Sequence, residues 1–199
     1  MMKDLRGWID YDRDRLPSLS LADRIDYFER RVRLVAVSPL RRILATEIIV
    51  QGEDSSALLI FGVSVCCAIE ASGKFLTGGV VGSALRFHAF LNNYMSPDFQ
   101  LKTIDGLAYG EALWRHFRNG LAHGFTVCHG GFEGGQGEPY FLVRKICGQD
   151  SLEVNPTLFF SDYVAGFERY LADLRAASLN DPLFMGFNNV FEKVFIRGE

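Results

Sequence analysis

The fold is decided by residues 57–76, which read ALLIFGVSVCCAIEASGKFL. This segment is apolar almost all round at helical spacing, so the helix it predicts is expected at the centre of a bundle. Gly78-Gly79 ends it. The most apolar part, 57–69, is too short to span a bilayer and continues into Glu70, so we expect no membrane-spanning segment.

Six further helices are predicted from capping residues and from apolar residues that recur at helical spacing. Ser38-Pro39 is expected to end one helix and start the next, because serine suits the N-cap and proline the first helical position. Gly124 is well placed to stop the helix before it. The six helices cover about residues 21–35, 38–50, 81–94, 105–123, 161–176 and 182–194.

Residues 125–155 break the helical pattern. Three short runs within them, at 125–129, 140–147 and 152–155, have strand character and predict a β-hairpin or small meander. The glycine-rich segment 130–139 contains neither GxxxxGK nor a GxGxxG after a strand, so we interpret it as a connection and not as a phosphate cradle.

The chain is therefore predicted to be a single, mostly α domain over residues 1–199, a helical bundle with a small antiparallel β-hairpin or meander inserted at 125–155. A charged N-terminal arm is expected at 1–19. The 17 phenylalanines are a large apolar load, which makes a self-association surface plausible.

Charge and cysteine content narrow the functional class. The formal net charge of −3 excludes a general polyanion binder, so a nucleic-acid site would have to be a local basic patch. The N-terminus is too charged for a signal peptide, and we expect a cytoplasmic protein. The spacing typical of a zinc site is absent, and we predict neither a metal nor a cofactor.

The four cysteines fall into two sets. Adjacent Cys66 and Cys67 lie in the apolar run and are expected to be buried thiols. Cys128-His129 with Cys147 is a weak candidate for a metal site, against ordinary reduced cysteines in facing strands.

The clearest chemical signal lies in residues 114–124, which read WRHFRNGLAHG. Arg118 can hold a phosphate by two parallel hydrogen bonds, and His123 can exchange a proton near neutral pH. RNA supplies its own nucleophile, the 2′-hydroxyl. A cation and an acid–base group are therefore the minimum equipment for cleaving RNA without a metal.

The segment Arg118-Asn119-Gly120-Leu121-Ala122-His123 resembles the Arg-x4–6-His signature of HEPN domains, in the form in which a polar residue follows the arginine. A second similarity is the stretch 68–75, where a glutamate, Glu70, is followed by small residues and a lysine. HEPN domains are helical bundles, and many resemble metal-independent endoribonucleases that act as homodimers in toxin–antitoxin and defence systems.

The resemblance implies a role for each of four residues. Arg118 would hold the scissile phosphate, His123 would be the general base or acid, and Asn119 would orient His123 or bind phosphate. Glu70 would be a helper acid. On an ideal α-helix Arg118 and His123 point about 140° apart, so the site needs a bent helix end or a second subunit across a two-fold axis.

Each residue also has a structural interpretation. His123 could favour the carbonyl end of the helix dipole, and Glu70 could pair with Lys74, Arg118 or another polar neighbour. Trp114 is expected in the core, and His88 and His116 at the surface or its boundary.

One set of basic residues could form an RNA-backbone surface, although Asp23, Asp26 and Glu29 nearby favour a self-paired face. The set comprises Arg30, Arg31, Arg33, Arg41 and Arg42.

Two functions follow. The first is a homodimeric, metal-independent endoribonuclease with an RNA substrate and a possible antitoxin partner. The second is a catalytically inactive dimer of the same fold that binds a nucleotide or a protein partner.

Overall fold

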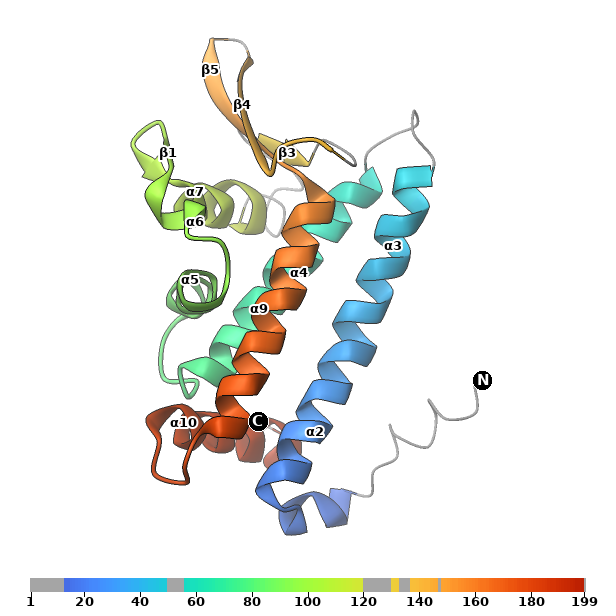
Figure 1. The fold of residues 1–199 in the computed structure, drawn as a ribbon, viewed down its shortest axis with the longest axis vertical. Coiled ribbons are helices and arrows are strands. Elements are labelled where there is room, and N and C mark those ends of the chain that lie inside the picture. The colour runs from blue at the N-terminus through green and yellow to red at the C-terminus, as the bar shows by residue number, and fades with distance from the viewer. Residues whose placement is uncertain (1–12, 50–55, 120–129, 133–136, 147, 199) are drawn as a thin grey trace.

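The computed structural model describes residues 13–49, 56–119, 130–132, 137–146 and 148–198, and it is mostly helical, as predicted. Long helices run side by side through most of its length, and a small sheet projects at one end (Figure 1). The central helix, α4 (Ser56–Leu76), packs against helices from both halves of the chain, which confirms its predicted position.

The first long rod is continuous from α2 (Leu21–Val32) through a π-helical turn, η2 (Arg33–Val37), into α3 (Ser38–Ile49). The predicted break at Ser38-Pro39 is wrong. Ser38 is helical, with φ −68° and ψ −43°, and its N–H donates to the carbonyl of Arg33, five residues back. Proline has no N–H with which to continue the α-helical ladder, and the π turn directly before it keeps the rod intact.

The segment predicted as one helix from residue 105 begins differently. After α5 (Ser83–Tyr94) and the short α6 (Asp98–Leu101), strands β1 (Thr103–Ile104) and β2 (Leu107–Ala108) form a tight antiparallel pair. Asp105 and Gly106 turn between them with φ values of 50° and 77°. Asp-Gly is a strong two-residue hairpin signal, and here it outweighs the helical spacing that follows.

The helix therefore starts at α7 (Tyr109–Ala112) and continues as a π-helical segment, η3 (Leu113–Asn119). Its predicted end at His123-Gly124 lies outside the described residues.

The predicted β-hairpin is present as β4 (Phe141–Ile146) and β5 (Gln149–Val154), paired antiparallel. A third strand, β3 (Gly130–Phe132), pairs with the other edge of β5 in parallel, so the strand order is β3-β5-β4. The strand predicted at 125–129 lies outside the described residues.

Helix α9 (Pro156–Ala176) begins five residues before its predicted start. Asn155 caps it, accepting hydrogen bonds from the backbone N–H of Thr157 at 3.0 Å and of Leu158 at 3.2 Å. Asn-Pro thus supplies both the N-cap and the first helical residue directly after β5. The last helix, α10 (Pro182–Phe191), starts where predicted, with Asp181 as its cap, and runs on as η4 (Glu192–Arg197).

The core is largely aromatic. Among the residues that the structure describes, fourteen phenylalanines are buried, and Phe141 and Phe195 pack against them partly buried. A single chain therefore buries this apolar load by itself, and the phenylalanine content no longer argues for self-association. Part of the predicted N-terminal arm also belongs to the fold, since the short helix η1 (Arg13–Ser18) packs on η4 and buries Leu16.

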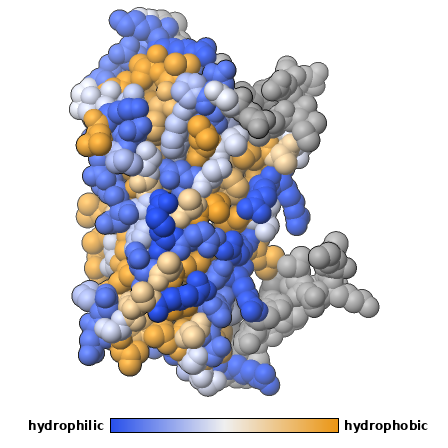
Figure 2. Space-filling view, viewed as in Figure 1, coloured by the Kyte–Doolittle hydropathy of each residue, from blue (hydrophilic) through white to orange (hydrophobic). Residues whose placement is uncertain are grey.

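The outer surface carries hydrophobic residues in separate patches between hydrophilic ones on the face drawn in Figure 2. None of the helices in the described part of the chain is both long and apolar enough to cross a membrane.

Helix α4 packs closely against α5 at Gly73, and this contact gives a first prediction. A Cβ built there would lie 1.9 Å from the backbone carbonyl oxygen of Arg86 on α5. Alanine ordinarily favours a helix over glycine by about 1 kcal/mol. Here we expect Gly73→Ala to lower the free energy of unfolding by about 1–3 kcal/mol, because backbone must move.

Urea unfolding followed by circular dichroism measures this effect. The control is Gly131→Ala, where the added Cβ meets no atom within 4 Å and the change should stay within about 0.5 kcal/mol. Equal stability of Gly73→Ala and the parent protein would show that α4 and α5 are not packed this closely.

Candidate functional site

The structure brings together two of the four residues singled out by the sequence. Arg118 on η3 donates from Nε and Nη2 to the same carboxylate oxygen, Oε2, of Glu70 on α4, at 3.1 and 2.9 Å. The side chains are 21% and 16% exposed, so the pair is half-buried and still reached by solvent. Pairing of Glu70 with Arg118 is one of the contacts predicted for this carboxylate.

Trp114 also contacts the Arg118 side chain. The guanidinium carbon lies 5.1 Å from the centre of the Trp114 ring, within the range of a cation–π interaction. Trp114 is itself buried and packs against Phe87 with ring centres 5.3 Å apart, which confirms its predicted place in the core. A carboxylate and an aromatic face therefore hold the Arg118 cation in one position.

The other two predicted site residues are not placed relative to this pair. Asn119 is the last residue of η3, and only its backbone is described. His123 lies outside the described residues.

The backbone register of η3 bears on the spacing of the signature. In a π-helix the hydrogen bonds join residues five apart, in place of four. Residues at i and i+5 are then closer to one face than on an ideal α-helix. The angle of about 140° expected for such a pair on an α-helix does not apply within residues 113–119.

The two cysteines of α4 lie near Arg118 and are poor nucleophiles. Burial raises the pKa of the Cys66 thiol well above its usual range, and the nearby positive charge of Arg118 offsets only part of that rise. Partial burial also raises the pKa of the Cys67 thiol. Cys67 is exposed, so the prediction that it is buried is wrong. Cys66 and Cys67 fall on different faces because consecutive residues of a helix point about 100° apart.

A second polar cluster, which the sequence did not reveal, lies one to two turns before Arg118. Glu111 contacts Arg115 through one oxygen and lies 3.0 Å from Nε2 of His88 through the other. The Arg115 hydrogen bond lowers the pKa of Glu111, which keeps its carboxylate ionised at neutral pH. Glu111 and Arg115 are four residues apart, a pairing that the sequence can suggest. His88 comes from α5, and no local pattern links it to them.

The arginine-rich face of the first rod is largely self-paired, which favours the structural interpretation. Arg33 bonds to Glu29 at 2.8 Å and to Glu168 of α9, and Arg175 bonds to Asp26 and Glu29. Arg31 lies over the ring of Phe195.

Two arginines on that rod do not take part in this pairing. Arg41 and Arg42 are exposed and make no ion pair with another residue in the described part of the chain.

No set of three or more His, Cys, Asp or Glu side chains in the described ranges is close enough to hold a metal ion. The sequence-based candidate, Cys128-His129 with Cys147, lies outside those ranges.

The Glu70–Arg118 pair gives a second prediction. We expect Glu70→Ala to lower the free energy of unfolding by about 1–3 kcal/mol, because it leaves a half-buried guanidinium without its acceptor. In a double-mutant cycle with Arg118→Ala, the second substitution should recover part of that loss. Urea unfolding of the four proteins measures the coupling.

Glu168→Ala is the matched control for this cycle. It removes the carboxylate that pairs with Arg33, and this pair is more exposed, since the Glu168 side chain is 47% exposed. The free energy of unfolding should fall by no more than about 1 kcal/mol. Additive effects of Glu70→Ala and Arg118→Ala would mean that the two side chains are not coupled.

Scans of this chain against protein-family models, curated proteins and solved structures found no match.

Proposed function

We propose that the protein is a metal-independent endoribonuclease of the HEPN type, with Arg118 and His123 as its catalytic residues. The observation that carries the proposal is the arginine held between a carboxylate and an aromatic ring at the C-terminal part of a bundle helix. A positive charge fixed in advance is what a phosphate-cleaving site needs, because its donors are then aimed before the charge develops.

The reaction needs two proton transfers and one cation. A base removes the proton from the 2′-hydroxyl, the 2′-oxygen attacks phosphorus, and the bond to the 5′-oxygen breaks as that oxygen takes a proton. The products are a 2′,3′-cyclic phosphate and a 5′-hydroxyl. His123 serves as base or acid, Arg118 stabilises the crowded phosphate, and Asn119 orients His123 or binds phosphate.

Glu70 has a positioning role in this proposal. A carboxylate that accepts two hydrogen bonds from a guanidinium is suited to hold that group and is a poor proton donor. We therefore propose that Glu70 positions Arg118 and does not act as the helper acid that the resemblance implies.

The wider setting is proposed on the same resemblance. Two copies of the 118–123 segment meet across a two-fold axis, so two histidines divide the acid and base roles. The protein acts on RNA in the cytoplasm, as a toxin or defence effector, and an antitoxin protein holds it in check.

One observation favours the second function, an inactive dimer of the same fold that binds a nucleotide or a protein partner. The Glu70 carboxylate already neutralises Arg118, and a satisfied arginine stabilises helix packing without any ligand. A protein that binds RNA or nucleotides and never cleaves them would fit this alternative.

The test of the enzyme is an incubation of the purified protein with end-labelled RNA, with and without a chelator. We expect cleavage that survives the chelator and leaves 2′,3′-cyclic phosphate ends. Cleavage that requires added divalent metal, or that leaves 3′-hydroxyl ends, would contradict this mechanism. Binding without cleavage would support the inactive alternative.

A further inference from the structure

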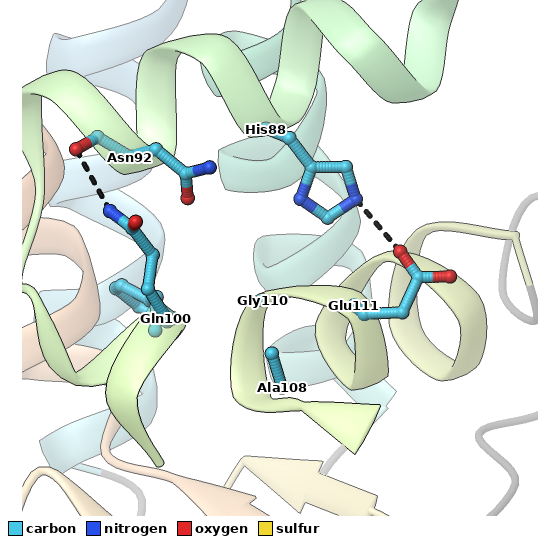
Figure 3. A pocket seen from close by; sticks show the side chains of 7 residues that line it. His88, Asn92, Gln100, Ala108, Gly110 and Glu111 are labelled. Carbon is cyan, nitrogen blue, oxygen red and sulfur yellow. Dashed lines mark hydrogen bonds and ion pairs between the residues drawn. The ribbon is translucent and has the colours of Figure 1, made fainter. Parts of the chain in front are cut away.

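A cleft of about 290 Å³ opens between α5 and the α6–α7 segment (Figure 3). Its walls carry one imidazole, two carboxamides and one carboxylate, and its apolar part comes from Phe99 and Ala108. The polar side chains are those of His88, Asn92, Gln100 and Glu111.

The two amide side chains of this cleft have hydrogen-bonding groups that no residue of the described chain uses. The amide of Gln100 donates to the backbone carbonyl of Asn92 at 3.1 Å, which leaves its own oxygen available. The Asn92 amide has no hydrogen-bond partner among the described residues, and Figure 3 shows it turned toward His88 and Gln100. In the same view one ring nitrogen of His88 faces Glu111, and the other faces the Asn92 side.

The charges in the cleft are already matched. Glu111 is paired with Arg115 and contacts His88, so the cleft has no unpaired cation to attract an anion. Side chains that both donate and accept, beside an apolar wall, suit a neutral ring with amino and carbonyl groups on its edge. Asn and Gln amides can recognise such an edge in a nucleobase by paired hydrogen bonds, as they do with adenine.

The cleft and Arg118 are joined by one continuous helix. Glu111, which lines the cleft, lies seven residues before Arg118 on the α7–η3 helix. Seven residues correspond to roughly 10 Å along the axis, about three stacked nucleotides of a single strand. Trp114 joins the two ends, with its ring under Arg118 and 6.4 Å from that of His88.

We propose that this cleft binds an unpaired RNA base a few nucleotides away from the phosphate held by Arg118, and so selects which linkage is cut. The assignment of RNA as the ligand rests on the proposed function. The base site itself needs no cleavage, because a nucleoside without phosphate contains the whole recognised group.

The test uses the full chain with Trp8→Phe, which leaves Trp114 as the single tryptophan beside the cleft. Adenosine, guanosine, cytidine and uridine are titrated, and Trp114 fluorescence is recorded. We expect saturable binding with a preference among the four. We expect Asn92→Ala and Gln100→Ala, each in this background, to weaken it about tenfold. The matched control is Asn93→Ala, since Asn93 bonds to the carbonyl of its own helix at Ala89 and should leave binding unchanged.

The outcomes separate this inference from the enzyme proposal. Nucleoside binding lost in Asn92→Ala supports the base site even when no RNA is cut. Cleavage of RNA with no nucleoside binding, and with the same cut sites in Asn92→Ala and Gln100→Ala, overturns the base site and leaves the enzyme standing. Near-ultraviolet circular dichroism confirms that each variant is folded.

Discussion

Replacement of His123 by alanine is expected to lower the rate of RNA cleavage by about 10²–10⁴-fold, the usual contribution of a general acid or base. Arg118→Ala should cost a similar factor, because the phosphate loses its fixed cation. The measurement is the single-turnover rate of cleavage in the presence of chelator. The double variant should be little worse than either single one if the two groups act on the same step.

The neighbouring residues provide matched controls for that experiment. His116→Ala removes an imidazole seven residues before His123 in the sequence, and Arg115→Ala removes a guanidinium that is 57% exposed and paired with Glu111. Both should keep the rate within a few-fold of the parent protein. Cleavage that survives in His123→Ala, or that falls equally in His116→Ala, would contradict the assigned roles.

Phe28→Ala is expected to be the most destabilising single truncation considered in this protein, at about 3–5 kcal/mol. Phe28 on α2 is 2% exposed, and its ring meets aromatic rings from three other helices. The centre-to-centre distances are 4.3 Å to Phe75 of α4, 5.7 Å to Phe167 of α9 and 5.4 Å to Phe187 of α10. Removing the ring leaves a cavity where all four helices meet.

Differential scanning calorimetry should show this loss as a drop in Tm of about 6–20 °C for a chain of this length. The control, Leu85→Ala, truncates a side chain that is 61% exposed and should change stability by no more than about 0.5 kcal/mol. A small effect of Phe28→Ala would show that α2 is not anchored in this aromatic cluster.

Helices were predictable wherever the signal was local. The apolar run of α4 and the predicted helix starts at residues 21 and 182 identify helices correctly, because each depends only on neighbouring residues. The errors arose where two local signals compete. Pro39 predicts a helix start, but a π turn directly before it continues the helix through this position. Asp105-Gly106 formed a hairpin turn in place of a helical first turn.

In the candidate site, too, local sequence patterns predict some features and only the tertiary structure shows the others. A short signature in the sequence selects Arg118, Asn119 and His123, and it adds Glu70 from another helix. That Glu70 receives both hydrogen bonds from Arg118 depends on α4 lying beside η3, which no local pattern specifies. The cleft around His88 was missed for the same reason, since its polar groups come from three separate segments.

By itself the sequence determined the helical class, the place of α4 at the centre and the residues able to do acid–base and phosphate chemistry. These depend on side-chain type and on spacing along the chain. The tertiary structure alone decided that one chain buries its aromatic load, that Arg118 is fixed by Glu70 and Trp114, and that His88 meets Glu111. Such contacts join residues distant in sequence, and packing of the whole chain determines which of them form.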